Sequence, residues 1–118
     1  MKTESAGKLL RIFIGESDRW GRQPLAIAIV EAARKAGIGG ATVFKGIEGF
    51  GAHSVIHAAR VLDLSTDLPI LIEIVDTEDK IRAFIPTLDQ MVTEGLVTLE
   101  TVEVVAYRTR KDPSAPRA

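Results

Sequence analysis

Residues 68–95, LPILIEIVDTEDKIRAFIPTLDQMVTEG, decide the fold because they contain a strand pattern followed directly by a helix pattern. The run LPILIEIV at 68–75 is apolar and β-branched, which is typical of a buried strand. Asp76 and Thr77 are both competent N-caps for the helix that follows, and Gly95 ends it. The helix carries an apolar stripe at helical spacing: Ile81, Phe84, Ile85, Leu88, Met91 and Val92. The stretch therefore predicts a β-α unit.

A second unit of this kind occurs earlier in the chain. We expect a strand at 8–15 (KLLRIFIG), a helix from Pro24 to Gly37 and a strand at 41–45 (ATVFK). A last strand is expected at 96–107. The order β-α-β, a long connection and then β-α-β predicts an α+β fold, the ferredoxin-like βαββαβ sandwich. In that fold an antiparallel sheet carries two helices on one face.

Length and composition limit the function. The 118 residues have room for one domain, expected over residues 8–108 between flexible ends at 1–7 and 109–118. Fifteen Lys and Arg against sixteen Asp and Glu leave a formal charge of −1, which favours no nucleic-acid partner. The absence of cysteine excludes disulfides and thiolate metal sites. No apolar run approaches the ~20 residues of a membrane span, and the polar N-terminus lacks a secretory signal, so a cytoplasmic protein is expected.

The alternation of residues along the strands predicts two different faces of the sheet. One face is expected to be purely apolar and to lie under the helices: Leu10, Ile12, Ile14, Ile70, Ile72, Ile74, Val102, Val104 and Ala106. The other face is mixed: Leu9, Phe13, Leu71, Val75, Val105 and Tyr107, interrupted by Arg11, Glu73 and Glu103. In a ferredoxin-like sheet the first strand lies between the third and fourth, so we expect Arg11 to lie between Glu73 and Glu103.

The mixed face bears on the oligomeric state. Two helices cover only one face of such a sheet, and a second face this apolar would be an unusually large patch if it were left in water. We therefore expect the protein to self-associate through this face. The alternative is a monomer whose sheet has one wetted face, as antiparallel sheets allow.

Residues 46–67, GIEGFGAHSVIHAARVLDLSTD, form a connection too long for an ordinary loop in so small a domain, and such segments tend to be functional. Its glycines, Gly46, Gly49 and Gly51, permit tight backbone bends and could let backbone amides approach an anion. Their order is not that of a dinucleotide-binding fingerprint.

The same connection holds the only two histidines, His53 and His57, in a stretch that could form a short helix. Four residues apart, both imidazoles would lie on one helix face, where they could share a metal with Glu48 or Asp63. The alternative is one solvated histidine and one packing histidine.

Two further groups of residues could bind a ligand. Trp20, the only tryptophan, could stack on a planar ligand with Arg19 or Arg22 on its phosphate, or it could cover the core beside the first helix. Arg108 and Arg110 could hold phosphate at the mouth of a cleft between subunits, or they could serve solubility alone. No Ser/His/Asp arrangement or helix-borne carboxylate pair has the spacing of a hydrolytic site, so an enzyme is not expected.

Four short motifs carry a resemblance to a known family: GIGGATV at 37–43, GIEGFG at 46–51, DLP at 67–69 and GLVTLE at 95–100. With these motifs, residues 8–108 resemble the PII-like family known as Domain of Unknown Function 190. The resemblance implies a ferredoxin-like subunit in a homotrimer whose three sheets face inward. It also implies that adenine nucleotides bind in clefts between subunits, and that the long connection is presented to partner enzymes or transporters.

The resemblance suggests roles for particular residues. In PII proteins an Arg-x-Arg just after the last strand contacts nucleotide phosphate, and Arg108-Thr109-Arg110 stands at the matching place. The sequence departs from the PII pattern at 93–96, Thr-Glu-Gly-Leu, where PII proteins have a glycine-rich phosphate loop with a lysine. Triphosphate binding of the PII kind is therefore not implied. Metal-tolerance proteins of the CutA type share the architecture, which retains the histidine pair as a candidate metal site.

These observations give one leading hypothesis and two alternatives. The leading hypothesis is a PII-like signalling protein that binds a small anionic effector, expected to be an adenine nucleotide, and regulates a partner such as a transporter or an enzyme. Effector binding would reorder residues 46–67 and so change the affinity for the partner. The residues expected at the ligand site are Arg108, Arg110, Lys45, Gly49, Gly51 and Trp20. The alternatives are a metal-binding CutA-like module using His53 and His57, and a structural adaptor without a ligand.

Overall fold

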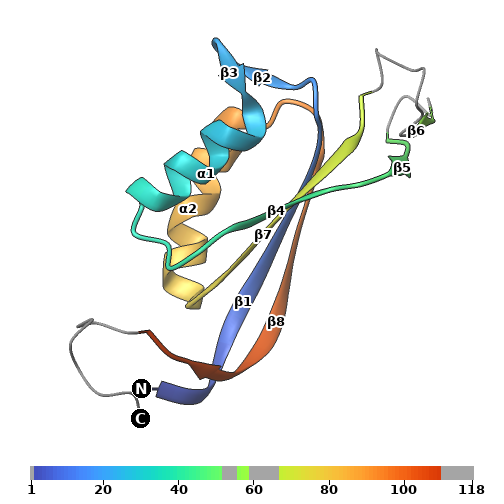
Figure 1. Cartoon of the computed structure of the whole chain (residues 1–118). Helices are drawn as coiled ribbons and strands as arrows, with labels where there is room; N and C mark the ends of the chain where they lie inside the picture. The colour runs from blue at the N-terminus through green and yellow to red at the C-terminus, as the bar shows by residue number, and fades with distance from the viewer. Residues whose placement is uncertain (1, 52–55, 59–66, 110–118) are drawn as a thin grey trace.

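The structure, a computed structural model, describes residues 2–51, 56–58 and 67–109. Four strands form an antiparallel sheet in the order β4-β7-β1-β8. Their bounds are Lys2–Gly15 for β1, Thr42–Lys45 for β4, Pro69–Asp76 for β7 and Leu96–Tyr107 for β8. The helices α1, Leu25–Lys35, and α2, Glu78–Met91, lie on the same face of this sheet (Figure 1). The predicted ferredoxin-like βαββαβ sandwich is confirmed.

Two short strand pairs lie outside the main sheet. Arg19–Trp20 (β2) and Gln23–Pro24 (β3) form a hairpin at the start of α1, whereas Glu48–Gly49 (β5) and His57–Ala58 (β6) lie on the other side of the sheet (Figure 1). The prediction of a short helix is wrong at His57, which lies in strand β6. His57 is extended because it pairs with Gly49, so that β6 folds back on β5.

The helix ends follow from local chemistry. Thr77 is the N-cap of α2, where its hydroxyl oxygen accepts a hydrogen bond from the backbone N–H of Lys80 at 3.4 Å. Pro24 is the N-cap of α1, one position before the predicted first turn. The backbone after α1 leaves the helix at Gly37, whose φ of +81° is readily adopted only by glycine.

The core lies between the helices and the even-numbered residues of β1 and β7. Leu10, Ile12 and Ile72 are fully buried there, as the strand pattern predicts. Ile29 of α1 and Ile81 of α2 pack against them from the helix side. Complete burial of each such side chain contributes about 1.5–3 kcal/mol to stability, so this layer holds the two halves of the chain together.

The prediction of which β8 residues face the helices is wrong. Leu10 pairs with Leu99, and directly paired residues point to the same face, so the odd-numbered residues of β8 lie on the helix side. Val102, Val104 and Ala106 therefore lie on the opposite face, which we call the open face. A strand repeats every two residues, so a one-residue change of register moves every side chain to the other face. Both residue sets of β8 contain valines, so the pattern alone did not fix the choice.

The same register corrects the expected ion pairs of Arg11. Its Nε donates to Glu73 at 2.9 Å, as predicted, but its Nη1 donates to Glu100 at 2.6 Å rather than to Glu103. Glu103 pairs with Ala6 and lies on the helix-side face. The hydrogen bond from Arg11 to Glu73, together with the negative charges of Glu73 and Glu100, raises the pKa of Arg11 above its ordinary value. This bridge therefore stays charged at the centre of the open face.

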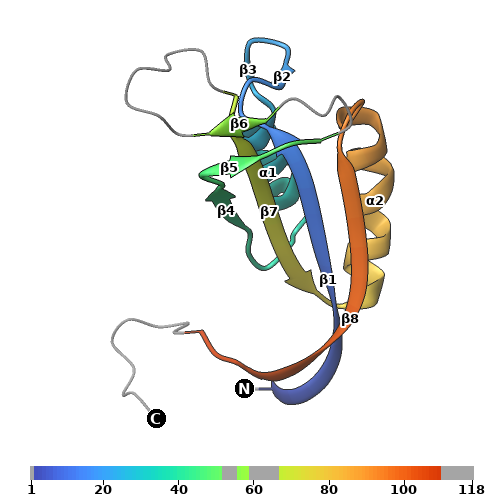
Figure 2. The same cartoon turned by 90° about the vertical axis from the view of Figure 1, so that its right-hand side faces the viewer.

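The first strand begins earlier than predicted. β1 begins at Lys2 instead of residue 8, because residues 2–7 pair with residues 102–107 of β8. β7 ends opposite Lys8, so this part of β1 and β8 extends beyond the rest of the sheet as a two-stranded ribbon (Figure 2). We call it the arm. Residues 2–7 therefore extend the sheet beyond the expected start of the domain.

Candidate functional site

A cleft of about 550 Å³ lies at the end of the sheet where β1 ends. Three segments form it: residues 13–18 at the end of β1, residues 48–51 around β5, and residues 94–96 just before β8. Asp67 and Pro69 complete the lining. We call this the glycine cleft, because Gly49 and Gly51 line it as backbone without side chains.

Backbone hydrogen bonds shape the wall of the glycine cleft after β1. The N–H of Gly15 donates to Asp18 Oδ2 at 2.9 Å, and the N–H of Ser17 donates to Asp67 Oδ1 at 2.7 Å. Glu16 N–H donates to the carbonyl of Leu68 at 2.8 Å. The end of the long connection is thus tied to the turn after β1, since two carboxylates accept backbone donors that have no partner in the sheet.

At two positions only glycine fits, because its Cα lies too close to neighbouring atoms to leave room for a side chain. Gly46 donates to the carbonyl of Pro69 at 2.7 Å, and a Cβ at Gly46 would lie 2.7 Å from the Pro69 ring. Gly95 has a φ of +156°, and a Cβ there would lie 2.6 Å from the carbonyl oxygen of Phe13. These glycines let the connection and the turn before β8 pack directly on the main sheet, which brings the walls of the cleft together.

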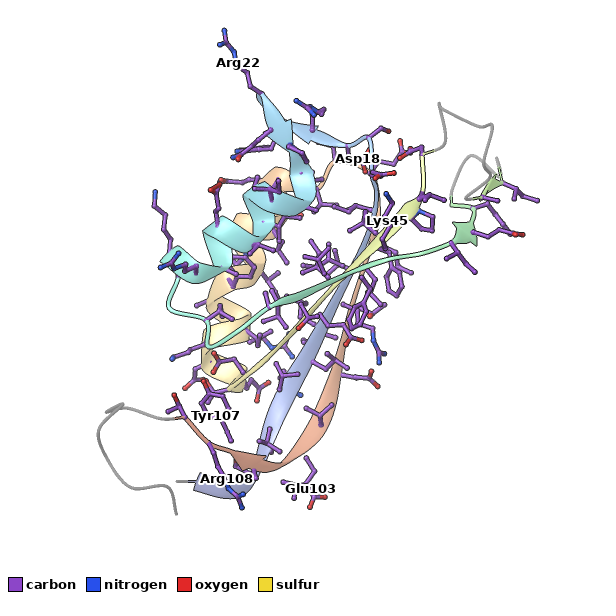
Figure 3. All side chains as sticks on the ribbon, in the orientation of Figure 1. Asp18, Arg22, Lys45, Glu103, Tyr107 and Arg108 are labelled. Carbon is purple, nitrogen blue, oxygen red and sulfur yellow. The ribbon has the colours of Figure 1, made fainter. Side chains whose placement is uncertain are left out.

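The charge of the glycine cleft is negative. Asp18, Glu48, Asp67 and Glu94 line it, and none of the described residues in its lining is Lys, Arg or His. Lys45 lies at the same end of the sheet as Asp18 (Figure 3), and its ammonium group forms an ion pair with Glu16. Carboxylates accept hydrogen bonds from hydroxyl and amino groups but repel phosphate, so the cleft of one chain suits a ligand group that donates hydrogen bonds and carries no negative charge.

The predicted basic residue Arg108 lies at the opposite end of the sheet from Lys45 (Figure 3). It follows Tyr107, which pairs with Lys2 at the start of β1, whereas Gly15 at the other end of β1 lines the glycine cleft. At about 3.3 Å per residue, this length of strand spans roughly 40 Å. Arg108 therefore cannot reach the cleft of its own chain.

The structure separates the remaining predicted residues. Trp20 is 43% exposed and lines a different hollow, between the helices. Arg110 and His53 lie outside the described residues, as does the side chain of His57. In the part of the chain that the structure describes, no three His, Asp or Glu side chains gather in an arrangement that could hold a metal ion.

Of the carboxylates in the glycine cleft, the sequence analysis named Glu48, as a metal ligand, but did not single out Asp18, Asp67 or Glu94. Asp67 belongs to the Asp-Leu-Pro motif and Glu94 to the turn before the last strand, two segments that the sequence analysis had singled out. No sequence pattern pointed to Asp18, because its role depends on the hydrogen bond that it accepts from the Gly15 N–H in a tight turn.

Among the described helices, neither has the length and apolar character needed to cross a membrane.

Comparison with solved structures supports the fold. A PII-like protein from Thermus thermophilus superposes with a TM-score of 0.64 at 18% identity, covering 88% of this chain and 94% of the other. CPII, a nitrogen regulatory PII-like protein from Thiomonas intermedia K12 solved with ADP, AMP and bicarbonate, gives 0.61 at 18% identity, covering 87% and 92%. At this identity the likeness extends to the fold.

Comparison of sequences identifies the family. A UPF0166 protein of Aquifex aeolicus (strain VF5) is 39% identical over 98 residues, covering 83% of this chain and 92% of its own. A UPF0166 protein of Methanocaldococcus jannaschii is 34% identical over 103 residues, covering 86% and 94%. The family model DUF190, described as "Uncharacterized ACR", matches residues 7–104. The chain therefore belongs to the DUF190 family, and its fold is that of the PII-like proteins.

Proposed function

We propose that this protein is a PII-like regulatory protein that binds an adenine nucleotide between the subunits of a homotrimer and controls a partner protein. The observation that carries the proposal is the division of the candidate site. The glycine cleft and Arg108 lie at opposite ends of one chain, so they can form one site only when two copies meet. The ADP and AMP bound by CPII indicate the class of ligand.

The open face supports the assembly. Phe13, Phe44, Val75 and Leu96 are between 37% and 57% exposed on it, around the charged bridge of Arg11. These side chains belong to all four strands of the main sheet, so exposed apolar groups occur across its whole width, on both sides of the Arg11 bridge. Covering it with two further copies removes this surface from water, and the arm then extends across a neighbouring subunit.

The charges of the two halves are complementary. Arg108 and Arg110 of one copy bring positive charge toward the negatively charged glycine cleft of the next copy, where they hold the phosphates. Lys45 and the backbone amides of Gly49 and Gly51 add donors on the cleft side. The cleft carboxylates accept hydrogen bonds from ribose hydroxyls or the adenine amino group.

The long connection supplies the link to a partner. In its described part, Ile47, Phe50 and Ile56 are all strongly exposed, with Ile47 at 80%. Phe50 lies between the two glycines that line the cleft, so a ligand that orders those glycines also fixes Phe50. Effector binding thereby changes which apolar side chains the connection presents, and with them the affinity for the partner.

Isothermal titration calorimetry with ADP, AMP and ATP tests the proposal. We expect one adenine nucleotide per chain, and no binding by the double variant Arg108→Ala/Arg110→Ala. The matched control is Arg82→Ala, which removes an exposed arginine of α2 paired with Glu78. Unchanged nucleotide affinity in the double variant, or equal losses in the double variant and the control, contradicts the assignment of the basic residues. Absence of binding by the wild-type protein contradicts the proposed function itself.

A further inference from the structure

The helix layer carries a second hollow that the proposed function does not use. It measures about 740 Å³ and lies between α1 and α2 under the β2–β3 hairpin. We call it the interhelical groove. The residues that decide its chemistry are Trp20, Glu31, Ala32, Arg34, Lys35 and Met91.

The floor of the interhelical groove is apolar. Ala32 on α1 has a short side chain that leaves space between the helices, and the facing side on α2 consists of the exposed Thr87 and Gln90 together with the buried Met91. Trp20 borders the groove from the hairpin and keeps 43% of its surface exposed. Ile27, which is 51% exposed, lies one turn before Glu31 and two turns before Lys35 and so extends this surface along α1. The β2–β3 hairpin and α1 thus each present a large, exposed apolar side chain to a partner, Trp20 and Ile27 respectively.

Positive charge borders this apolar floor at the end of α1, and a further cation lies at the hairpin tip outside the groove lining. Arg34 and Lys35 occupy the last turn of α1, and Arg22 extends from the tip of the β2–β3 hairpin (Figure 3). Within the described ranges, none of these three residues forms an ion pair. Among the described residues that line the groove, Glu31 is the only acidic one. The surface is therefore complementary to a segment that combines apolar and acidic side chains.

The interhelical groove stays accessible in the proposed trimer. The helices lie on one side of the main sheet and the open face lies on the other (Figure 1, Figure 2). Covering the open face with neighbouring copies leaves the helix layer on the outside. An occupant of the groove can thus bind whether or not the glycine cleft is filled.

We propose that the interhelical groove docks an acidic amphipathic helix of a partner protein. The apolar face of that helix packs on Trp20, Ile27 and Ala32, and its carboxylates pair with Arg34 and Lys35. A third helix fits because the groove between two packed helices accepts the side-chain ridge of another. The open form of the groove also favours a helix over a small molecule, which requires an enclosing pocket.

Fluorescence of Trp20, the only tryptophan of the chain, reports directly on occupancy of the groove. The probe is a synthetic, tryptophan-free peptide of about four helical turns, with leucines along one face and glutamates on the other. We expect this acidic peptide to shift the emission of Trp20 to shorter wavelength in a saturable manner. A matched peptide with lysine in place of every glutamate should leave the emission unchanged. No shift with the acidic peptide at millimolar concentration, or the same shift with both peptides, overturns the proposal.

A pair of charge reversals locates the contact. Arg34→Glu should weaken binding of the acidic peptide by about tenfold or more, because a favourable charge pair becomes a repulsion. Arg82→Glu, which makes the same charge change on the exposed surface of α2 outside the groove lining, should retain the wild-type affinity. Equal affinity for wild type and Arg34→Glu, or equal losses in the two variants, overturns the assignment to the groove. Circular dichroism of both variants verifies that the fold is intact.

Discussion

Mixing two variant subunits tests whether the nucleotide site is shared between copies. The first variant, Arg108→Ala/Arg110→Ala, loses the basic residues after β8 but keeps its glycine cleft. The second, Gly51→Phe, keeps the basic residues but fills its cleft. A side chain at Gly51 meets no obstruction, because no atom beyond its chain neighbours lies within 4 Å of the Cβ position. Each variant alone is expected to bind no ADP, the first for lack of cations and the second for lack of room.

The length of β1 determines the expected stoichiometry. Because about 13 residues at 3.3 Å place Arg108 roughly 40 Å from the cleft of its own chain, a working site needs an intact cleft and the intact arm of a neighbour. In a mixed ring of three subunits, one interface of this kind forms whenever both variants are present. Random reassembly of an equal mixture puts both variants into about three quarters of the rings, which restores about one quarter of the wild-type sites.

Calorimetric titration with ADP measures this stoichiometry after the mixture has been unfolded together and refolded. The two proteins refolded separately and then combined serve as the control and should remain without binding. A refolded mixture that also binds no ADP would refute the reasoning, because a site contained within one chain cannot be rescued by mixing. Wild-type binding by either pure variant would refute it as well.

Three further predictions concern the fold and the assembly. Gly95→Ala should lower the free energy of unfolding, measured in urea, by about 1–3 kcal/mol, because its Cβ would lie 2.6 Å from a carbonyl oxygen of β1 at a φ of +156°. The control Gly40→Ala, which has open space at its Cβ, should be nearly neutral. Equal effects of the two substitutions would count against the close approach at Gly95. Ile72→Ala should lower the free energy of unfolding by about 2–5 kcal/mol, because Ile72 is fully buried. Ile27→Ala, at a half-exposed position of α1, serves as the surface control. A small effect at Ile72 would mean that the core is elsewhere. Leu96→Glu places a charge on the open face and should give a monomer in sedimentation experiments, while a persistent trimer would show that the face is not the interface.

Local patterns were sufficient for most of the element boundaries. The 96–107 strand, the N-cap Thr77 and the helix end at Gly37 each depend on residues close in sequence, and the structure confirms them. The start of β1 was missed because residues 2–7, KTESAG, include no large apolar or β-branched aliphatic side chain. They become a strand only because β8 provides a partner along its whole length.

The candidate site was predictable only in part. The glycines of the long connection suggested a backbone surface, and Gly49 and Gly51 do line a cleft. Its carboxylates come from segments far apart in the sequence, and Asp18 and Asp67 meet only because the ends of β1 and β7 are adjacent in the sheet. Trp20 likewise reaches the interhelical groove through a turn whose direction no periodicity encodes.

The sequence by itself determined the order of strands and helices and the apolar layer of Leu10, Ile12 and Ile72, because hydrophobic periodicity and capping act over a few residues. Only the tertiary structure decided which face of β8 meets the helices, that Arg11 pairs with Glu100, and that Arg108 lies far from the glycine cleft. These features depend on strand register, which is set by all the contacts of the sheet together. A shift of one residue would have reversed the first two without changing a single local preference, whereas the distance of Arg108 from the cleft follows from the pairing of β8 along the whole of β1.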